Sequence, residues 1–338
     1  MAVGISGYGV YIPRLRIKKE DYAKAWGTFS AAGISEKSVM GYDEDVLTAA
    51  SKVAKRALES VPLNPDKVTR FSLASTTPPY TEKLLSGTVL VSLGIPNSAL
   101  TSDHTSSTRA GTEAMLAGFE HVKANPSGKA VVAVADAPLA SMWDSFEHAL
   151  GAGAAGFVLS SENLIAELEG HASYASEYFG ERFRPRDADL IRDLNVKKFS
   201  ESSLLTNTMR AGTALMKQLG RKPEEFNHIV IQQPDARVPA TVGARMNFTD
   251  SQMAAGLTSK MLGDMGAASV PVSLVAVLDA AKVGDTIMVI SYGSGAGSDA
   301  ISFKKISDRR ADPTFQAEAD RKEYIDYIKY LKLKGAIV

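Results

Sequence analysis

The sequence predicts a layered α/β fold built from two similar halves. Strands that are apolar on both faces alternate with helices that carry one apolar stripe, which indicates mixed sheets covered by helices on both sides. The same order of elements occurs twice, at an offset of roughly 150–160 residues. Each half also contains one helix rich in small residues, which suits a helix enclosed between two sheets.

The first half opens with an amphipathic helix at residues 45–60, whose stripe includes Val46, Ala49 and Val53. It continues with a buried strand, a second helix, the small-residue helix, a very apolar strand and a glycine turn leading into another strand: residues 68–74, 84–93, 109–123, 130–135 and 151–159. The second half repeats this order at residues 203–219, 228–233, 240–246, 268–281, 286–291 and 293–301.

The boundaries follow from this repeat. We expect an N-terminal half at 1–165, an insertion or connector at 166–202, a C-terminal half at 203–306 and a tail at 307–338. The connector region is polar and aromatic. The tail begins with a charged stretch and ends in apolar residues at helical spacing, namely Tyr324, Tyr327, Ile328 and Leu331. We predict a tail helix that docks on the protein, with partner binding as the alternative.

Composition excludes several classes of function. The chain has 338 residues, with 38 basic and 38 acidic side chains, so it carries no net charge. This balance argues against nucleic acid and against an anionic membrane as partners. No apolar run reaches about 18 residues and no signal-peptide pattern opens the chain, so we expect a cytoplasmic protein. The absence of cysteine excludes disulfides and thiolate metal sites, and the five histidines form no metal-binding pair.

Six motifs, in this order and spacing, resemble the thiolase superfamily, most closely the 3-hydroxy-3-methylglutaryl-CoA synthase family in its archaeal and bacterial form. They lie at residues 7–14, 41–45, 79–80, 109–114, 151–156 and 291–300. The resemblance covers nearly the whole chain and is specific for the fold, not for the reaction. It implies a thiolase-like α-β-α-β-α arrangement with mixed five-stranded sheets.

The resemblance also implies three catalytic positions, and this chain has changed all of them. The family condenses two acyl-CoA thioesters with a cysteine, a glutamate and a histidine. Its patterns place these on Thr108, Thr76 and Gln232 respectively. A threonine hydroxyl is far less acidic than a thiol, and neither Thr76 nor Gln232 can exchange a proton as a general base. Losing all three indicates that the chemistry is no longer selected.

Other candidates for a substrate pocket lie around these positions: His104, Ser106, Ser107, Asp264 and Ser294. A serine activated by His104 is one alternative, and hydroxyls that cap the helix beginning near Arg109 are the other. Asp264 falls in a segment that helps to hold substrate in the family, or serves as a helix N-cap. Ser294 matches a substrate-contacting residue, or belongs to a turn whose glycines shape the sheet edge.

Three functions remain open. The first is a non-catalytic subunit of a multi-component acyl-CoA acyltransferase/thiolase complex. By the resemblance, it would form a homodimer and scaffold a thiolase and a small zinc-ribbon/OB-fold protein. The second is an acyltransferase of changed mechanism that uses a serine or threonine near Thr108 on a CoA thioester. The third is a module that binds CoA esters without turnover. We expect no metal and no cofactor of its own, with a CoA thioester as candidate ligand.

Overall fold

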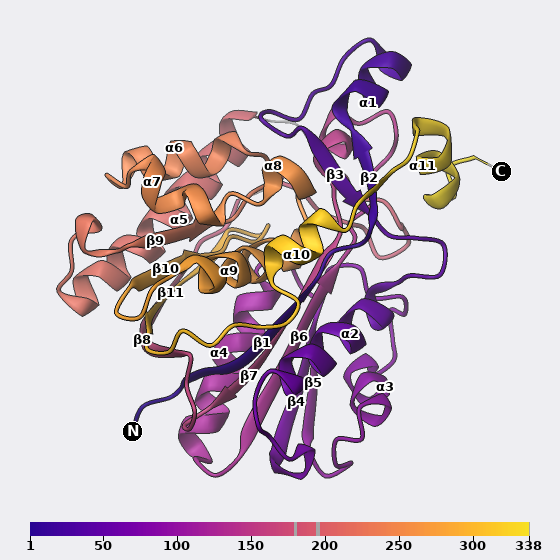
Figure 1. Cartoon of the computed structure of the whole chain (residues 1–338). Helices are drawn as coiled ribbons and strands as arrows, with labels where there is room; N and C mark the ends of the chain where they lie inside the picture. Colours follow the sequence, from indigo (N-terminus) through magenta and orange to yellow (C-terminus); the bar gives the residue numbers. More distant parts are fainter. Residues whose placement is uncertain (179–180, 194–196, 338) are drawn as a thin grey trace.

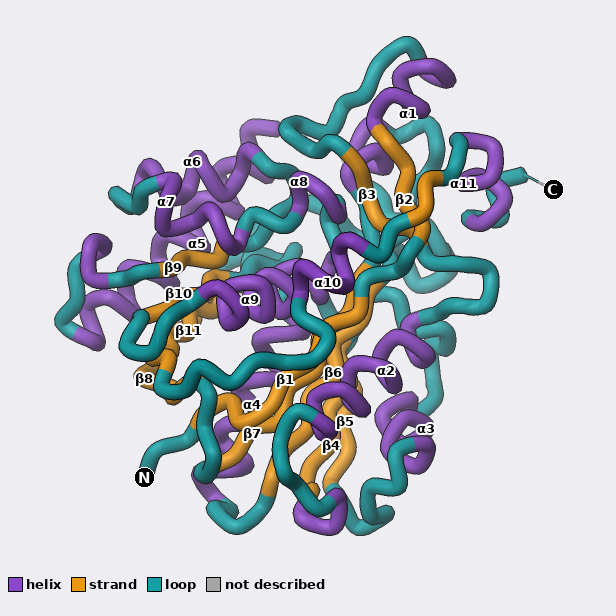
Figure 2. Tube along the Cα trace, viewed as in Figure 1, coloured by secondary structure: helices purple, strands orange, loops and turns teal. Residues whose placement is uncertain are grey.

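The computed structural model describes residues 1–178, 181–193 and 197–337 (Figure 1). Within these ranges nine strands form one mixed sheet, and helices cover it on both sides (Figure 2). Five strands come from the predicted N-terminal half and four follow it in the chain. The layered α/β class predicted from the sequence is confirmed.

The first five strands lie in the order β5-β4-β6-β7-β1. Their bounds are β1 Gly4–Tyr11, β4 Val68–Ala74, β5 Leu100–His104, β6 Lys129–Asp136 and β7 Gly153–Ser160. Strand β4 is parallel to β5 and β6, whereas β7 is antiparallel to β6 and β1. Helices α2 (Val46–Glu59) and α3 (Leu85–Ser92) pack their apolar sides on one face of this group.

The other four strands lie in the order β8-β11-β10-β9. Their bounds are β8 Ala166–Ala175, β9 His228–Ile231, β10 Thr286–Ile290 and β11 Gly297–Lys305. Helices α5 (Lys197–Leu219) and α6 (Arg237–Arg245) lie over this group, followed by the short helices α7 (Asp250–Met253) and α8 (Ser259–Leu262). The two groups of strands meet where Gly4 and Ile5 of β1 pair with β8.

Two strand assignments differ from the prediction. The second group has four strands in the described residues rather than five. Strand β8 also lies inside the predicted connector at 166–202, where it pairs with nine residues of β11, from Gly297 to Lys305. Polar residues occupy every second position along most of β8, and most of its residues are only half-buried, so it lacks the continuous apolar run that marked the other predicted strands.

The two helices rich in small residues occupy the middle layer, as predicted. They are α4 (Ala110–Ala124) and α9 (Ser269–Ala280), and their side chains share one apolar core with residues of both strand groups. A Cβ at Gly111 would lie 2.7 Å from the carbonyl oxygen of Ala267, so the close approach at the start of α4 requires glycine. The layers therefore run helix, strand group, helix, strand group, helix, with the two strand groups joined in one sheet between β1 and β8.

The tail returns to a small sheet at one end of the molecule. Strands β2 (Leu15–Lys18), β3 (Glu36–Val39) and β12 (Glu323–Tyr324) form this sheet, with helices α1 (Lys19–Trp26), α10 (Phe315–Asp320) and α11 (Tyr327–Leu333) beside it. The predicted tail helix is shorter than expected, because its first residues join the sheet as β12. Tyr327 and Leu331 are buried as predicted, whereas Tyr324 and Ile328 are exposed. No helix in the described ranges is long and apolar enough to cross a bilayer.

Candidate functional site

Two cavities adjoin one another near the start of α4, with volumes of about 510 and 440 Å³. Thr108, Glu181, Arg182 and Ser294 line both. The first cavity also contacts three predicted site residues, which are Thr76, Ser106 and Ser107. The second also contacts Gln232 and Asp264. The structure thus brings together seven of the eight predicted positions, which are spread over more than 200 residues of sequence.

The eighth position, His104, lines neither cavity. It lies in β5, where its Nε2 is 3.2 Å from the hydroxyl of Ser102. Burial lowers the pKa of His104 and Arg70 acts in the same direction, although Glu113 and Asp103 act against them, so the neutral ring is favoured near pH 7. Ser106 instead contacts Glu113 at 3.5 Å. His104 is therefore not arranged as the base for a serine in this structure.

Thr108 lies two residues before the start of α4 and is buried. Its hydroxyl donates a hydrogen bond of 2.6 Å to the carbonyl oxygen of Tyr292. The N-cap residue of α4 is Arg109, whose side chain makes no capping hydrogen bond. The expected hydroxyl caps do not form on the first turn of α4: Thr108 bonds to Tyr292, and Ser107 accepts only the N–H of Arg109, at 3.4 Å.

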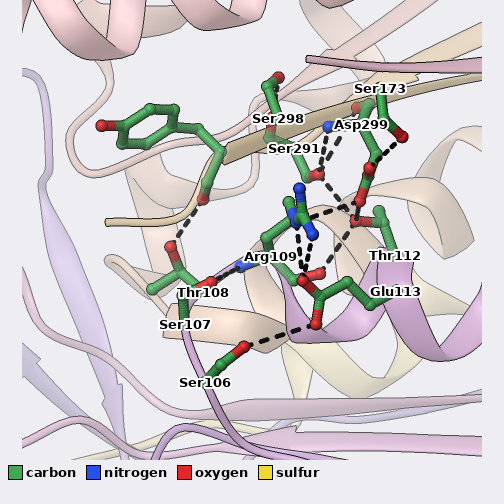
Figure 3. Close-up of polar contacts among 11 residues, drawn as sticks. Ser106, Ser107, Thr108, Arg109, Thr112, Glu113, Ser173, Ser291, Ser298 and Asp299 are labelled. Carbon is green, nitrogen blue, oxygen red and sulfur yellow. Dashed lines mark hydrogen bonds and ion pairs between the residues drawn. The ribbon is translucent and has the colours of Figure 1, made fainter. Parts of the chain in front are cut away.

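A polar network holds this end of α4 against β11 (Figure 3). Arg109 lies beside Glu113, with its Nε 2.8 Å from the carboxylate, and is 3.5 Å from Asp299. Asp299 also accepts hydrogen bonds from Thr112 at 2.8 Å and from Ser173 at 2.6 Å. These contacts engage the Arg109 guanidinium with two carboxylates. Arg109 thus has a structural role that accounts for its position.

Thr76 lines the first cavity, but its hydroxyl is directed to a buried carboxylate. It donates a hydrogen bond of 2.7 Å to Asp136, which also accepts bonds from Ser75, Thr77 and the backbone N–H of Ala267. Asp136 is fully buried at the end of β6. The hydrogen bond from Ala267 to Asp136 joins the two halves of the chain. Sequence reasoning missed Asp136, since nothing in its local pattern separates it from a strand-end residue.

Gln232 and Asp264 meet at Gly266. The Gln232 side chain donates from Nε2 to the Gly266 carbonyl at 3.2 Å, and Asp264 accepts the Gly266 N–H at 2.9 Å. Asp264 also accepts from the Ser269 hydroxyl and forms an ion pair of 2.6 Å with Arg182. Asp264 therefore accepts a backbone N–H in the turn before α9, as a capping residue would. Helix α9 itself has no side-chain cap.

Glu181, Arg182 and Tyr292 are site residues that sequence reasoning missed. The Tyr292 hydroxyl donates to Glu181 and accepts from Ser203 at 2.6 Å. Burial and then Glu181 raise the pKa of Tyr292, which keeps this hydroxyl protonated. Glu181 and Arg182 belong to the predicted connector at 166–202. Their only local signal was the high charge of that segment.

Glycines in the turn before β11 let it approach the residues ahead of α4. A Cβ at Gly293 would lie 2.2 Å from the Ser107 hydroxyl, so a larger residue there would displace Ser107. Ser294 follows in the same turn and faces both cavities. In the part of the chain that is described, no group of three or more His, Cys, Asp or Glu side chains is arranged to hold a metal ion.

Comparisons with known proteins agree with this architecture. Residues 216–305 match the family model for the C-terminal part of 3-oxoacyl-[acyl-carrier-protein (ACP)] synthase III. The hydroxymethylglutaryl-CoA synthase of Thermococcus kodakarensis is 33% identical over 343 residues, covering 99% of this chain and 97% of the relative.

Two solved structures share the fold. MvaS in complex with 3-hydroxy-3-methylglutaryl coenzyme A is 20% identical, with a TM-score of 0.85 and coverage of 98% of this chain and 91% of that one. The curacin biosynthetic HMG synthase in complex with holo donor-ACP is 19% identical, with a TM-score of 0.86 and coverage of 98% and 88%. The thiolase-like layered fold is confirmed.

Proposed function

The chain belongs to the hydroxymethylglutaryl-CoA synthase family of the thiolase superfamily, and we propose that it is a non-catalytic subunit of a multi-component acyl-CoA acyltransferase/thiolase complex. One observation carries the proposal. The three positions that the family resemblance assigns to chemistry hold Thr108, Thr76 and Gln232, and each side chain is hydrogen-bonded into the protein.

The chemistry of these side chains explains why they support a silent site. A thiolate forms near neutral pH at a helix start, whereas a threonine hydroxyl needs a base to remove its proton. The Thr108 proton points to the carbonyl oxygen of Tyr292, which is not a base of that strength. Removing a general acid or base typically costs about 10²–10⁴-fold in rate, and here two such groups are replaced as well as the nucleophile.

The proposed partners are a cysteine-bearing thiolase and a small zinc-ribbon/OB-fold protein, with this chain as a cytoplasmic homodimer. A fold with a complete middle layer, but without the family's three reactive groups, suits a scaffold. The curacin HMG synthase was solved in complex with a donor-ACP, so a protein of this fold binds another protein at least there.

The test is to purify the tagged chain from its native host and to identify co-purifying proteins by mass spectrometry. A thioester-cleavage assay is run on the chain alone and on the mixture. We expect a thiolase and a zinc-ribbon protein, with activity only in the mixture. Thioester condensation by the chain alone, at rates near those of active relatives, would overturn the proposal.

The open cavities favour a second candidate, an acyltransferase of changed mechanism. Ser106, Ser107 and Thr108 all line the larger cavity, so an acyl group could reach a hydroxyl there. An acyl adduct on the intact protein after treatment with acyl-CoA would support this candidate. The absence of an adduct, with unchanged activity in the triple alanine variant of these residues, would exclude it.

The same cavities also favour the third candidate, a module that binds CoA esters without turnover. Micromolar binding of CoA to the isolated homodimer in calorimetry would favour such a sensor, and no binding would favour the scaffold. The test is independent of partner proteins.

A further inference from the structure

Two lysine side chains meet one carboxylate where the tail helix α11 docks beside the small sheet (Figure 1). Lys37 of β3 is 1% exposed, and its Nζ lies 3.2 Å from the carboxylate of Glu147. Lys334 directly follows α11 and is half-buried, with its Nζ 3.4 Å from the carbonyl oxygen of Pro138. Both ammonium groups lie near Tyr330, at 4.8 and 5.4 Å from the centre of its ring. Lys334 forms no ion pair among the described residues, so Glu147 is the carboxylate that both amines share.

The other titratable side chains packed around these amines carry no charge near pH 7. They are Tyr22 of α1, His148 beside it, and Tyr327 and Tyr330 of α11. Burial is the main reason that the pKa of each tyrosine lies above its ordinary value, and Glu147 acts in the same direction. Burial also lowers the pKa of His148, so its ring is neutral. Although burial opposes it, the charge of the two lysines holds the pKa of Glu147 below its ordinary value, so this carboxylate is charged.

The net charge under α11 therefore depends on the two amines. With both protonated, two positive charges face one negative charge, and a buried charge without a counter-charge is costly. Burial and then the charge of Lys37 lower the pKa of Lys334 to about 7, although Glu147 counteracts them. In a released tail, the hydrated Lys334 returns to the ordinary pKa of 10.5. Between these two values the released tail binds one proton more than the docked tail, so falling pH weakens docking until about pH 7.

The contacts that dock α11 also reach a wall of the smaller cavity. Glu147, which accepts a hydrogen bond from the Tyr330 hydroxyl, belongs to a short 3₁₀ helix at Ser145–Ala149. Ala149, at the end of this helix, lines the smaller cavity. Its carbonyl oxygen accepts the backbone N–H of Asp264 at 2.6 Å. One continuous set of contacts therefore runs from the tail through this short helix to the cavity wall.

We propose that α11 docks reversibly, tightly when Lys334 is neutral and weakly when Lys37 and Lys334 both carry a proton. Release of α11 removes the support of the Ser145–Ala149 helix and loosens that wall of the smaller cavity. The device lies outside the three changed catalytic positions and needs no partner protein. It therefore goes beyond the scaffold function and can hold or fail independently of it.

The experiment uses single thiols in the full-length chain, which contains no cysteine of its own. Leu331→Cys places a thiol on the buried side of α11, where the leucine is 8% exposed. Ile328→Cys places one on the outer side of the same helix, where the isoleucine is 58% exposed. The rates of reaction with iodoacetamide are measured from pH 7 to 9. Their ratio gives the fraction of released tail, because the pH dependence of thiolate formation cancels between the two variants.

We expect the released fraction to fall between pH 7 and 9, at least about tenfold more steeply in the parent chain than with Lys334→Met. Lys37 titrates in the same range, so that variant keeps part of the dependence. Lys332→Met, at an exposed position of the same helix, is the control and should keep all of it. Lys334→Gln repeats the test if the methionine variant does not fold. The proposal is overturned by an equal pH dependence with and without Lys334, or by a Leu331→Cys thiol that reacts as fast as the Ile328→Cys thiol or not at all.

Hydrogen exchange tests the connection to the cavity wall. Leu331→Ala weakens docking of α11 without touching Glu147, whereas Ile328→Ala changes an exposed side chain of the same helix. At pH 7 we expect the amides of residues 145–151 to exchange at least about tenfold faster in Leu331→Ala, as the loss of a buried leucine side chain allows. The Ile328→Ala variant should exchange like the parent. Faster exchange confined to the tail, or equal in both variants, contradicts the connection.

Discussion

Two buried polar regions of this molecule differ in one respect, which is whether every group has a partner. The tail cluster, formed by Tyr22, Lys37, Glu147 and Tyr330, lies under the C-terminal helix α11. Lys37 is 1% exposed and donates to the backbone oxygen of Glu147 at 2.7 Å, to its carboxylate at 3.2 Å and to Tyr330 at 3.1 Å. Both tyrosine hydroxyls also donate to Glu147.

The cavity trio, formed by Glu181, Arg182 and Gln232, is equally anchored but keeps three unpaired atoms. A fully paired network fixes the fold, whereas a partly paired one costs stability. Burial of polar groups therefore has different consequences in the two regions. In the tail cluster it secures the docked tail, whereas in the cavity trio it leaves three polar atoms without a hydrogen bond.

The electrostatics of the tail cluster agree with a structural role. Burial lowers the pKa of Lys37 to about 8, although Glu147 counteracts this. Burial alone would raise the pKa of Glu147, but Lys37, Lys334 and the two tyrosines hold it below its ordinary value. At pH 7 both members of the pair are therefore charged.

The same substitution in the two regions gives the largest contrast. Glu147→Gln removes the counter-charge of the buried Lys37 and should lower the free energy of unfolding by about 3–5 kcal/mol. Glu181→Gln removes a carboxylate that has no cation partner and should change it by less than about 1 kcal/mol. Urea unfolding of both variants measures the difference. Equal losses would show that the two regions do not differ in kind.

The pH dependence of stability sharpens the contrast next. The pKa of Lys37 is about 8 in the fold against an ordinary value of 10.5, so between these values the unfolded chain binds one proton more. Stability therefore rises with pH in this window, by about 1.4 kcal/mol per pH unit for this group, and the cost of the charged lysine is fully present below pH 8.

We expect Lys37→Met to lose that slope between pH 8 and 9.5, measured by urea unfolding at several pH values. Lys55→Met, whose side chain is 66% exposed, is the matched control and should keep it. The readout is the slope, so a lower absolute stability of the Lys37 variant does not affect it. A variant slope equal to that of the unaltered protein would contradict the assignment.

Within the cavity, the one complete pair should matter more than the unpaired atoms. Asp264→Ala removes the partner of Arg182 and two further hydrogen bonds, and should cost about 2 kcal/mol. Water screens part of this, because the Arg182 side chain is 20% exposed. The double variant Asp264→Ala, Arg182→Met should lose less than the sum of the single losses, as coupled partners do. Additive losses would mean that the pair is not coupled.

The smallest effect is expected at Gln232. Gln232→Leu removes the unpaired carbonyl oxygen and one hydrogen bond to Gly266, and these opposing effects should leave the free energy of unfolding within about 1 kcal/mol. The melting temperature of the ligand-free protein measures this. A loss of several kcal/mol would show that Gln232 is structural, like the tail cluster.

Much of the fold could be predicted because its signals are local. Helix α2 follows from its apolar stripe and from the Asp45–Thr48 capping box, and the middle layer follows from the small residues of α4 and α9. Strand β8 was missed because it alternates small or apolar residues with polar ones and is mostly half-buried, so it has no continuous apolar run. The first tail residues were assigned to a helix, although tertiary pairing with β2 makes them a strand.

The sequence by itself determined that Thr76, Thr108 and Gln232 cannot act as nucleophile or general base in the way that cysteine, glutamate and histidine do. Such reactivity is a property of each residue type and does not depend on the fold. Only the tertiary structure decided which groups surround them. Glu181 and Arg182 reach the cavity from a segment far from it in the chain, and the Arg182–Asp264 pair spans 82 residues. Burial and pairing depend on such long-range contacts, which local periodicity does not encode.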